Sequence, residues 1–292
     1  MGPPAVSIGI PTFNRASLLQ SVIDNLRNQT FGDFELVISD NASTDPRVRA
    51  VCESAAREDP RLRCYYHDRN QGAAANFWFV YEQARAPLFM WASDDDVWPQ
   101  DFIERGVNAL RLQPSASAWF CQVTSINFAG EVIRTLPSFR RFSSTNRRAA
   151  DLVRFLWEPE VEGKANLIHA LFRRETLAEV IDEWKTWPES WGADMAVVYG
   201  YLCRHDLVVD DGISLLKRAH PSERQQNIAD PRAFIYPWPE ARGYFRSYLA
   251  AAHGTRYRAL TFATLCARWL YDVGYHGLVL RRRAPLLPPA RR

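Results

Sequence analysis

The chain has 292 residues, a length that allows one or two domains, and its hydrophobic share of 47% and charged share of 24% are those of a globular protein. It contains no run of about 18 apolar residues, which excludes a membrane-spanning helix. The last twelve residues hold five arginines and no acidic residue, so the other 280 residues carry a formal charge of −2, which argues against a nucleic-acid-binding protein.

The first 112 residues predict a mostly parallel sheet with helices on both faces. Short apolar runs predict strands at Ala5–Ile10, Phe34–Ser39, Leu62–Tyr66 and Leu88–Trp91. Amphipathic stretches between and after them predict helices at Ala16–Gln29, Pro46–Glu58, Ala73–Ala84 and Gln100–Leu112. This alternation is typical of crossover connections, and the turns that follow the strands gather at the carboxyl edge of the sheet, where ligands bind in open α/β folds.

After Pro114 the pattern changes to mixed elements. We expect antiparallel strands, helices and two late strands at Ala118–Ile126, Glu131–Leu136, Asp151–Trp157, Arg174–Glu183, Asp194–Arg204, Leu207–Val209 and Ile213–Lys217. From about Pro231 the sequence is helical and aromatic. We therefore expect one α/β domain over residues 1–228, with halves 1–112 and 113–228, and a helical C-terminal extension over 229–292 that ends in an Arg/Pro tail.

Three adjacent carboxylates, Asp94, Asp95 and Asp96, directly follow a predicted buried strand. Adjacent acids repel one another, so the group is tolerated mainly where a cation neutralises it, and hard ions such as Mg²⁺ or Mn²⁺ prefer oxygen ligands of this kind. A diphosphate-bearing substrate is the natural companion of such an ion. The alternative is an acidic loop that caps the next helix from its N-terminal side.

Three further turns offer polar groups at the same edge. The turn with Pro11, Thr12, Asn14 and Arg15 can present backbone groups to a base and positive charge to a phosphate. The alternative is a plain strand-to-helix connection in which Asn14 or Ser17 caps the helix.

Asp40 ends the second strand, where its carboxylate can accept from a base N–H or a ribose hydroxyl, while Thr44 or Asp45 caps the next helix. In a third turn Gly72 permits close backbone approach, and Asn76 follows about one helical turn later.

Taken in this order, the segments resemble the family 2 glycosyltransferases with the GT-A fold. The matching features are the opening IPTFNRASLL, the ISDNASTD after the second strand, the RNQGAAAN turn and the SDDDVWP run. The resemblance covers about the first 110 residues and thins to scattered positions as far as about Gln226. It implies a Rossmann-like GT-A sheet, a nucleotide-diphosphate sugar, Mn²⁺ or Mg²⁺ held by an Asp-rich motif, and an inverting displacement assisted by a carboxylate base.

The resemblance also implies roles for individual residues. The nucleotide would contact Pro11, Thr12, Asn14, Arg15, Asp40, Arg69, Asp94 and Asp95. Asp40 would face the base and Arg69 would lie near the base or the phosphates. Asp96 is our first choice of metal ligand, with Asp94 nearer the ribose or sugar and a second metal candidate. Ser93 occupies the first position of the family's Asp-x-Asp-Asp pattern, which leaves the division of labour among the three acids open.

The catalytic base is expected well downstream, at the start of a helix beside the sugar site. Asp194 fits this place, because its segment resembles the family's Glu-Asp pair with Ala193 in place of the Glu. In this hypothesis Asp194 takes the proton from the acceptor hydroxyl while that oxygen attacks the anomeric carbon. The alternative is a carboxylate that merely stabilises the start of the helix.

The resemblance points to further ligands in the second half. His220 stands in a segment that resembles the late family segment over the diphosphate, and it would complete the metal shell; the alternative is an ordinary surface or core histidine. Trp191, with Trp184 and Trp187, crowds the approach to Asp194, and such rings stack on sugars or pack in a core. We take Trp191 and Asn76 as the substrate-binding candidates.

The leading hypothesis is therefore an inverting, metal-dependent glycosyltransferase that moves one sugar from a UDP- or dTDP-sugar to a hydroxyl acceptor. The alternatives are a nucleotidylyltransferase, which would need a Gly-rich phosphate loop that the Gly9–Arg15 turn does not supply, and a non-catalytic nucleotide-sugar-binding protein.

The sequence says less about the acceptor substrate and the cellular location than about the donor site. The Arg281–Arg283 cluster fits an anionic membrane surface and a lipid-linked glycan acceptor; a natural-product acceptor with a disordered tail is equally compatible. The five scattered cysteines lack the paired spacing of zinc or redox sites, and no secretory signal opens the chain. We expect a cytoplasmic protein, with membrane association on the cytoplasmic face as the variant.

Overall fold

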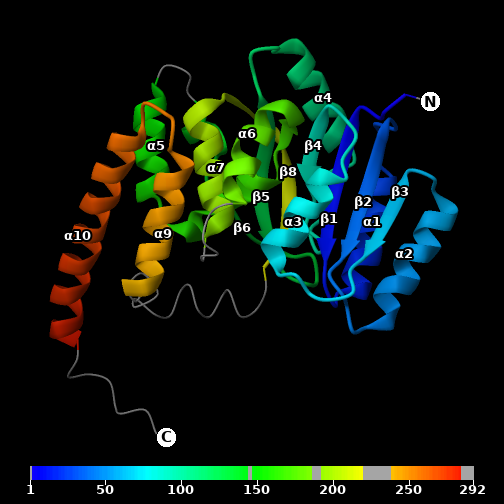
Figure 1. Ribbon diagram of the computed structural model, residues 1–292, viewed down its shortest axis with the longest axis horizontal. Coiled ribbons are helices and arrows are strands. Elements are labelled where there is room, and N and C mark those ends of the chain that lie inside the picture. The colour runs from blue at the N-terminus through cyan, green and yellow to red at the C-terminus, as the bar shows by residue number, and fades with distance from the viewer. Residues whose placement is uncertain (1, 144–146, 186–191, 220–237, 284–292) are drawn as a thin grey trace, which may run out of the picture.

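The computed structural model describes residues 2–143, 147–185, 192–219 and 238–283. Within these residues an eight-stranded sheet runs through the molecule in the order β3-β2-β1-β4-β7-β5-β6, with β8 beside β5 (Figure 1). The sheet is mixed. The strands of the N-terminal half pair in parallel, as the alternation of strands and helices predicts, and the second half adds three antiparallel pairs and one further parallel pair.

The N-terminal half follows the predicted order, and every element begins and ends within two residues of its predicted bounds. Its elements are β1 (Val6–Thr12), α1 (Ala16–Arg27), β2 (Phe34–Asp40), α2 (Pro46–Glu58), β3 (Leu62–Tyr66), α3 (Ala73–Glu82), β4 (Leu88–Trp91) and α4 (Phe102–Leu112). Strand β1 pairs in parallel with both β2 and β4, and β2 with β3. The central strands are buried on both faces, which is why they read as continuous apolar runs.

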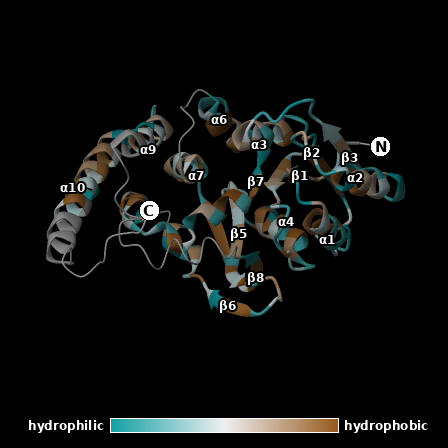
Figure 2. Ribbon diagram, turned by 90° about the horizontal axis from the view of Figure 1, so that it is seen from below, coloured by the Kyte–Doolittle hydropathy of each residue, from teal (hydrophilic) through white to brown (hydrophobic). Residues whose placement is uncertain are grey.

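The second half completes the sheet and its helical cover. Its elements are β5 (Ala118–Ile126), β6 (Val132–Thr135), η1 (Phe139–Phe142), α5 (Arg148–Trp157), η3 (Glu160–Glu162), η4 (Lys164–His169), β7 (Leu171–Arg173), α6 (Arg174–Trp184), α7 (Ala193–Arg204), β8 (Leu207–Arg218), α9 (Trp238–Ala251) and α10 (Arg258–Arg283). Helices α3, α6 and α7 lie on one face of the sheet and α1, α2 and α4 on the other (Figure 2). Helices α9 and α10 stand at the end farthest from β3, and no described helix is long and apolar enough to cross a membrane.

Two features differ from the predicted elements. The two late strands are one strand, β8, which lies parallel to β5 and bulges between Asp210 and Ser214. The prediction missed β7, which pairs antiparallel with both β4 and β5. A three-residue strand is too short to show alternation, so the neighbouring strands, and not local pattern, define it.

Strand β1 and helix α3 approach each other so closely that only glycine fits at position 9. A Cβ on Gly9 would lie 2.6 Å from Val80 Cγ2 and 3.0 Å from Phe89 Cζ. We expect Gly9→Ala to lower the free energy of unfolding by about 1–3 kcal/mol through overpacking, measured by urea denaturation. Gly32→Ala is the matched control, because a Cβ there meets nothing within 4 Å, and an equal effect of the two substitutions would contradict the packing argument.

Candidate active site

The turns after β1, β2 and β3 meet at the carboxyl edge of the sheet, and Asn41 joins them. Its backbone N–H donates to Thr12 O at 3.0 Å. Its side-chain Nδ2 donates to Asn70 Oδ1 and to Gly72 O, at 2.9 and 3.1 Å, while its Oδ1 accepts from Gln71 N at 2.9 Å. Asn41 therefore fixes the spacing of the three turns.

The turn after β1 is bound to the acidic run. The Thr12 hydroxyl donates to Asp94 Oδ2 at 2.8 Å, and Arg15 Nη1 donates to Asp94 Oδ1 at 3.0 Å and to Asp95 Oδ2 at 2.6 Å. The remaining Asp95 oxygen, Oδ1, accepts from the Ser93 hydroxyl. Burial raises the pKa of Asp94, while the Arg15 guanidinium acts against this rise. One guanidinium thus pairs with two of the three adjacent acids.

Asn14 has a left-handed backbone, φ 56°, and holds the first two turns together. Its Oδ1 accepts from the backbone N–H groups of Thr44 and Asp45, at 2.8 and 3.1 Å, and its own N–H donates to Ser43 Oγ at 2.8 Å. Asp45 in turn caps α2 by accepting from Arg47 N, as predicted. Helix α1 has no side-chain cap, so the alternative in which Asn14 or Ser17 caps the helix is wrong.

The remaining N-terminal candidates differ in their surroundings. Asp40 is buried at the end of β2, and its Oδ1 accepts from Ser43 N at 2.9 Å. Asn76 is also buried, and its Nδ2 donates to Ser39 O at 3.1 Å, so it joins α3 to the end of β2. Arg69 is exposed on the turn after β3. Pro11 lies next to the end of β1, opposite Ser39 of β2.

Asp96 lies deepest of the three acids and contacts the end of β8. Its Oδ1 accepts from Arg218 N at 3.0 Å, and its Oδ2 lies 3.6 Å from Lys217 Nζ. Asp96 Oδ2 is buried and accepts no hydrogen bond from the described residues. The backbones of Val97 and Leu216 exchange two hydrogen bonds, at 2.9 and 3.0 Å, which hold β8 against the acidic loop.

Below the acidic loop lies His169, at the end of η4. Its Nδ1 is 2.9 Å from Trp91 O, and because a carbonyl only accepts, Nδ1 carries the proton. Burial and the Lys217 ammonium lower the pKa of His169, so the ring is neutral near pH 7. A neutral ring with its proton on Nδ1 keeps an acceptor lone pair on Nε2.

Asp194 lies in the first turn of α7, one residue after the helix begins. Burial raises the pKa of its carboxyl group, and Lys217 acts against this rise. Because Lys217 also contacts Asp96, the predicted base and the deepest acid lie in the field of the same cation. The helix start that the sequence predicts is confirmed, with Gly192 as the residue before it.

Several predicted residues have a different setting or lie outside the described residues. Trp184 is buried and packs edge-to-face on Trp78 and Trp91, with ring centroids 5.5 and 6.4 Å apart, so it belongs to the core. His220 and Trp191 lie outside the described residues, as does Trp187. The acidic run does not cap α4, which begins at Phe102 behind Asp101, so that alternative is wrong.

Sequence reasoning missed Lys217, Arg218 and His169 as neighbours of the acidic run. Lys217 and Arg218 carry the signal used for the other turns, since polar residues stand there at the end of a strand. The sequence predicted their strand as two short pieces, and no local pattern placed the end of the second piece on the acidic loop. His169 lies on a short 3₁₀ turn, and no local pattern marks it.

A mostly parallel α/β sheet whose carboxyl edge gathers acids, amides and cations defines a nucleotide-binding protein of the GT-A type. Residues 7–177, more than half of the chain, match the family described as glycosyl transferase family 2. The chain belongs to that family.

Two curated relatives each match about a third of this chain. It is 34% identical over 95 residues to the GalNAc(5)-diNAcBac-PP-undecaprenol beta-1,3-glucosyltransferase of Campylobacter jejuni, a match that covers 32% of this chain and 30% of the relative. It is 26% identical over 102 residues to a putative teichuronic acid biosynthesis glycosyltransferase of Bacillus subtilis, covering 35% of this chain and 40% of the relative. The matches therefore span less than half of either relative's length.

Solved structures extend the similarity to almost the whole chain. Staphylococcus aureus TarS 1-349 in complex with UDP-GlcNAc has a TM-score of 0.64 at 15% identity and covers 91% of this chain and 73% of its own. The mannosyltransferase PcManGT from Pyrobaculum calidifontis, in complex with GDP-Man and Mn²⁺, has a TM-score of 0.53 at 17% identity. The match covers 97% of this chain and 80% of the mannosyltransferase chain. At such identities the likeness shows the shared fold.

Proposed function

We propose that the protein is an inverting, metal-dependent glycosyltransferase that moves a single sugar from a UDP- or dTDP-sugar to a hydroxyl group of a lipid-linked glycan. The observation that carries this proposal is the buried Asp96 carboxylate, which keeps one oxygen without a hydrogen bond beside Lys217. A buried carboxylate oxygen without a donor is costly unless a cation or ligand completes it.

The donor atoms at this edge fit a divalent ion that binds together with a diphosphate. Both oxygens of Asp94 and of Asp95 already accept hydrogen bonds, whereas Asp96 Oδ2 accepts none from the described residues. Within the described ranges no three acidic, His or Cys side chains converge as a metal cage. Mg²⁺ and Mn²⁺ are often held by one or two carboxylates plus substrate phosphates, so Asp96, with His220 as a proposed second ligand, would hold the ion, which would neutralise the leaving diphosphate.

We assign roles to the other candidates, of which Trp191 lies outside the described residues. Arg15 and Arg69 would contact the phosphates, and Asp40 would accept from the base. Asp194 would take the acceptor proton, because a carboxylate whose pKa is raised is a stronger base than an ordinary one. Trp191 would stack on the sugar, and Asn76 would hold the edge of the donor site rigid through Ser39 O.

The relatives support the proposed donor and acceptor classes. TarS is seen with UDP-GlcNAc and with UDP, which supports a uridine donor. The Campylobacter relative is named for a PP-undecaprenol glycan, which supports a lipid-linked acceptor over a natural-product one. The Mn²⁺ in the PcManGT complex supports a divalent ion.

A donor panel tests the proposal. We expect the enzyme, incubated with UDP-, dTDP- and GDP-sugars and Mn²⁺, to release UDP or dTDP from one donor and no guanine nucleotide, as read by mass spectrometry. Chelation with EDTA should abolish the release, since the leaving diphosphate would then remain unneutralised. With a polyprenyl-diphosphate glycan acceptor, the product should carry the anomeric configuration opposite to that of the donor, as read by proton coupling constants.

The same panel separates the alternatives. Pyrophosphate formed from a nucleoside triphosphate and a sugar phosphate would identify a nucleotidylyltransferase instead. Binding of a donor without turnover under every condition would identify a non-catalytic sugar-nucleotide-binding protein. Retention of configuration, or full turnover in EDTA, would contradict the inverting or metal-dependent part of the proposal.

A further inference from the structure

Helix α10 exposes apolar side chains to an extent that no other described element does. Phe262, Leu270 and Val273 are 56%, 63% and 47% exposed, and Trp269 is 36% exposed. Half of the ten large hydrophobic residues that are exposed in the described part of the chain lie on this helix. Water-exposed apolar surface that gathers on one element is typical of an interaction site.

These side chains share one side of the helix. At 3.6 residues per turn, positions 262, 269, 270 and 273 fall on one face, which we call the outer stripe. The opposite face is packed, since Thr261, Thr264 and Leu265 are buried. A helix at the edge of a water-soluble body normally turns a polar face outward, and α10 does not.

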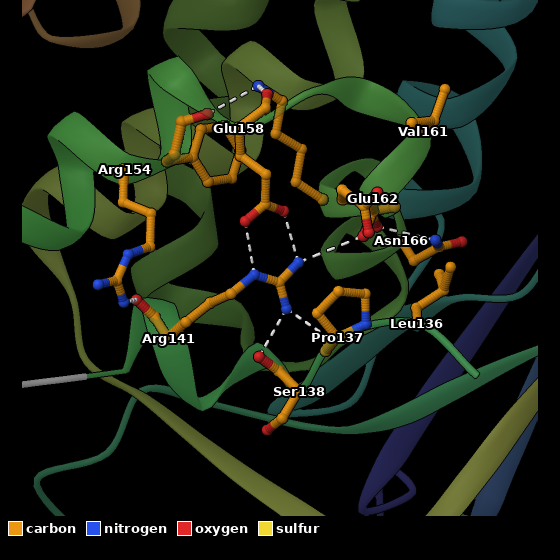
Figure 3. A network of polar contacts seen from close by, with 12 residues as sticks. Leu136, Pro137, Ser138, Arg141, Arg154, Glu158, Val161, Glu162 and Asn166 are labelled. Atoms are coloured by element: carbon orange, nitrogen blue, oxygen red, sulfur yellow. Dashed lines mark hydrogen bonds and ion pairs between the residues drawn. The ribbon is translucent and has the colours of Figure 1, made fainter. Parts of the chain in front are cut away.

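The inner face is fixed to the body, so the outer stripe points away from it. Arg268 of α10 donates to the carbonyls of Leu156 and Glu158 at the end of α5. Lys164 Nζ donates to Phe155 O and Glu158 O, at 2.7 and 2.8 Å. The Glu158 carboxylate is held by Arg141, whose guanidinium also binds nearby carbonyls (Figure 3). The last carbonyls of α5 are thus shared by the Lys164 amino group and the Arg268 guanidinium, the second of which belongs to α10.

The sequence that follows the outer stripe is positively charged, which favours a negatively charged partner. Helix α10 ends at Arg281–Arg283, and the last twelve residues of the chain hold five arginines and no acid. Strand β1 and α10 run in the same direction in Figure 1, so this basic end lies on the side of the molecule where the parallel strands end. Apolar and Trp side chains followed by an arginine cluster are complementary to an anionic bilayer surface.

We propose that the outer stripe of α10 docks on an anionic lipid surface and lies in the plane of its headgroups, and that the positive charge of the C-terminal sequence gives the preference for anionic lipid. The proposed function enters only as the reason for docking, because docking would bring the carboxyl edge of the sheet to an acceptor held in the membrane. Docking itself requires no turnover.

Vesicle co-sedimentation of the full chain tests this docking. We expect binding to phosphatidylglycerol vesicles and at least tenfold weaker binding to phosphatidylcholine vesicles. Phe262→Glu/Leu270→Glu should reduce binding to the anionic vesicles at least tenfold, because two buried carboxylates would oppose insertion. Leu112→Glu is the matched control, since Leu112 is 82% exposed on α4, and it should bind as the unchanged chain does.

Three outcomes would overturn the proposal: no binding to anionic vesicles, equal binding by the stripe variant, or an equal loss in the Leu112→Glu control. A dimer that light scattering detects in the unchanged chain and not in the stripe variant would also overturn it, because a second copy would then cover the stripe. Circular dichroism verifies the fold of both variants. Nucleotide release in the absence of lipid should be the same in all three proteins, which separates failure of docking from failure of the proposed function.

Discussion

Asp194→Asn should abolish sugar transfer almost completely while leaving the donor bound. Removal of a positioned general base costs about 10²–10⁴-fold in turnover, and the amide retains the size of the carboxylate without its basicity. Donor affinity, measured by calorimetry with the UDP-sugar, should change little, since Asp194 would act on the acceptor. Asp182→Asn, an exposed acid on α6, is the control and should keep normal transfer.

The pH profile adds a readout that a purely structural role would not move. Burial raises the pKa of Asp194, and a base works only when ionised, so turnover should fall as the pH decreases through this raised pKa. The acid limb of kcat/KM should therefore lie above the usual range of aspartate and disappear in Asp194→Asn. Near-normal turnover of the variant would contradict the role of Asp194 as the base and would leave it as a carboxylate that stabilises the start of α7.

Asp96→Asn should produce the second large loss. Asparagine can still accept from Arg218 N through its Oδ1, so the contact between the acidic loop and β8 is kept. What disappears is the negative charge beside Lys217 and the proposed metal ligand. Loss of a preorganised electrostatic contact of this kind costs about 10²–10³-fold in turnover. We also expect the Mn²⁺ concentration for half-maximal activity to rise at least tenfold.

The matched substitution is Asp101→Asn, in the same segment and outside the edge of the sheet. Asp101 pairs with Arg105 on an exposed surface, and such pairs contribute little, so activity and Mn²⁺ dependence should stay as they are. If Asp96→Asn responded to Mn²⁺ as the unchanged enzyme does, Asp96 would not be the metal ligand. A shift confined to Asp94→Asn would move the assignment to Asp94, whose oxygens face Thr12 and Arg15.

Local sequence patterns were enough to predict the strands and helices of the N-terminal half of the fold. Strands β1, β2 and β4 are buried on both faces and therefore appear as unbroken apolar runs. Parallel strands also place their following turns on one edge, so the acidic run and the turn with Arg15 could be assigned to one site before any contact was known.

The contacts between distant segments required the folded chain. Strand β7 exists because β4 and β5 offer it partners on both sides. The difference between Asp96 and its two neighbours depends on Arg15, about 80 residues before the run, and on Lys217, about 120 residues after it. Residue order does not encode such distances, because the energy of a charge depends on which groups folding brings within a few ångströms of it. The sequence could therefore name the three acids, and the packing of β8 against their loop distinguished them.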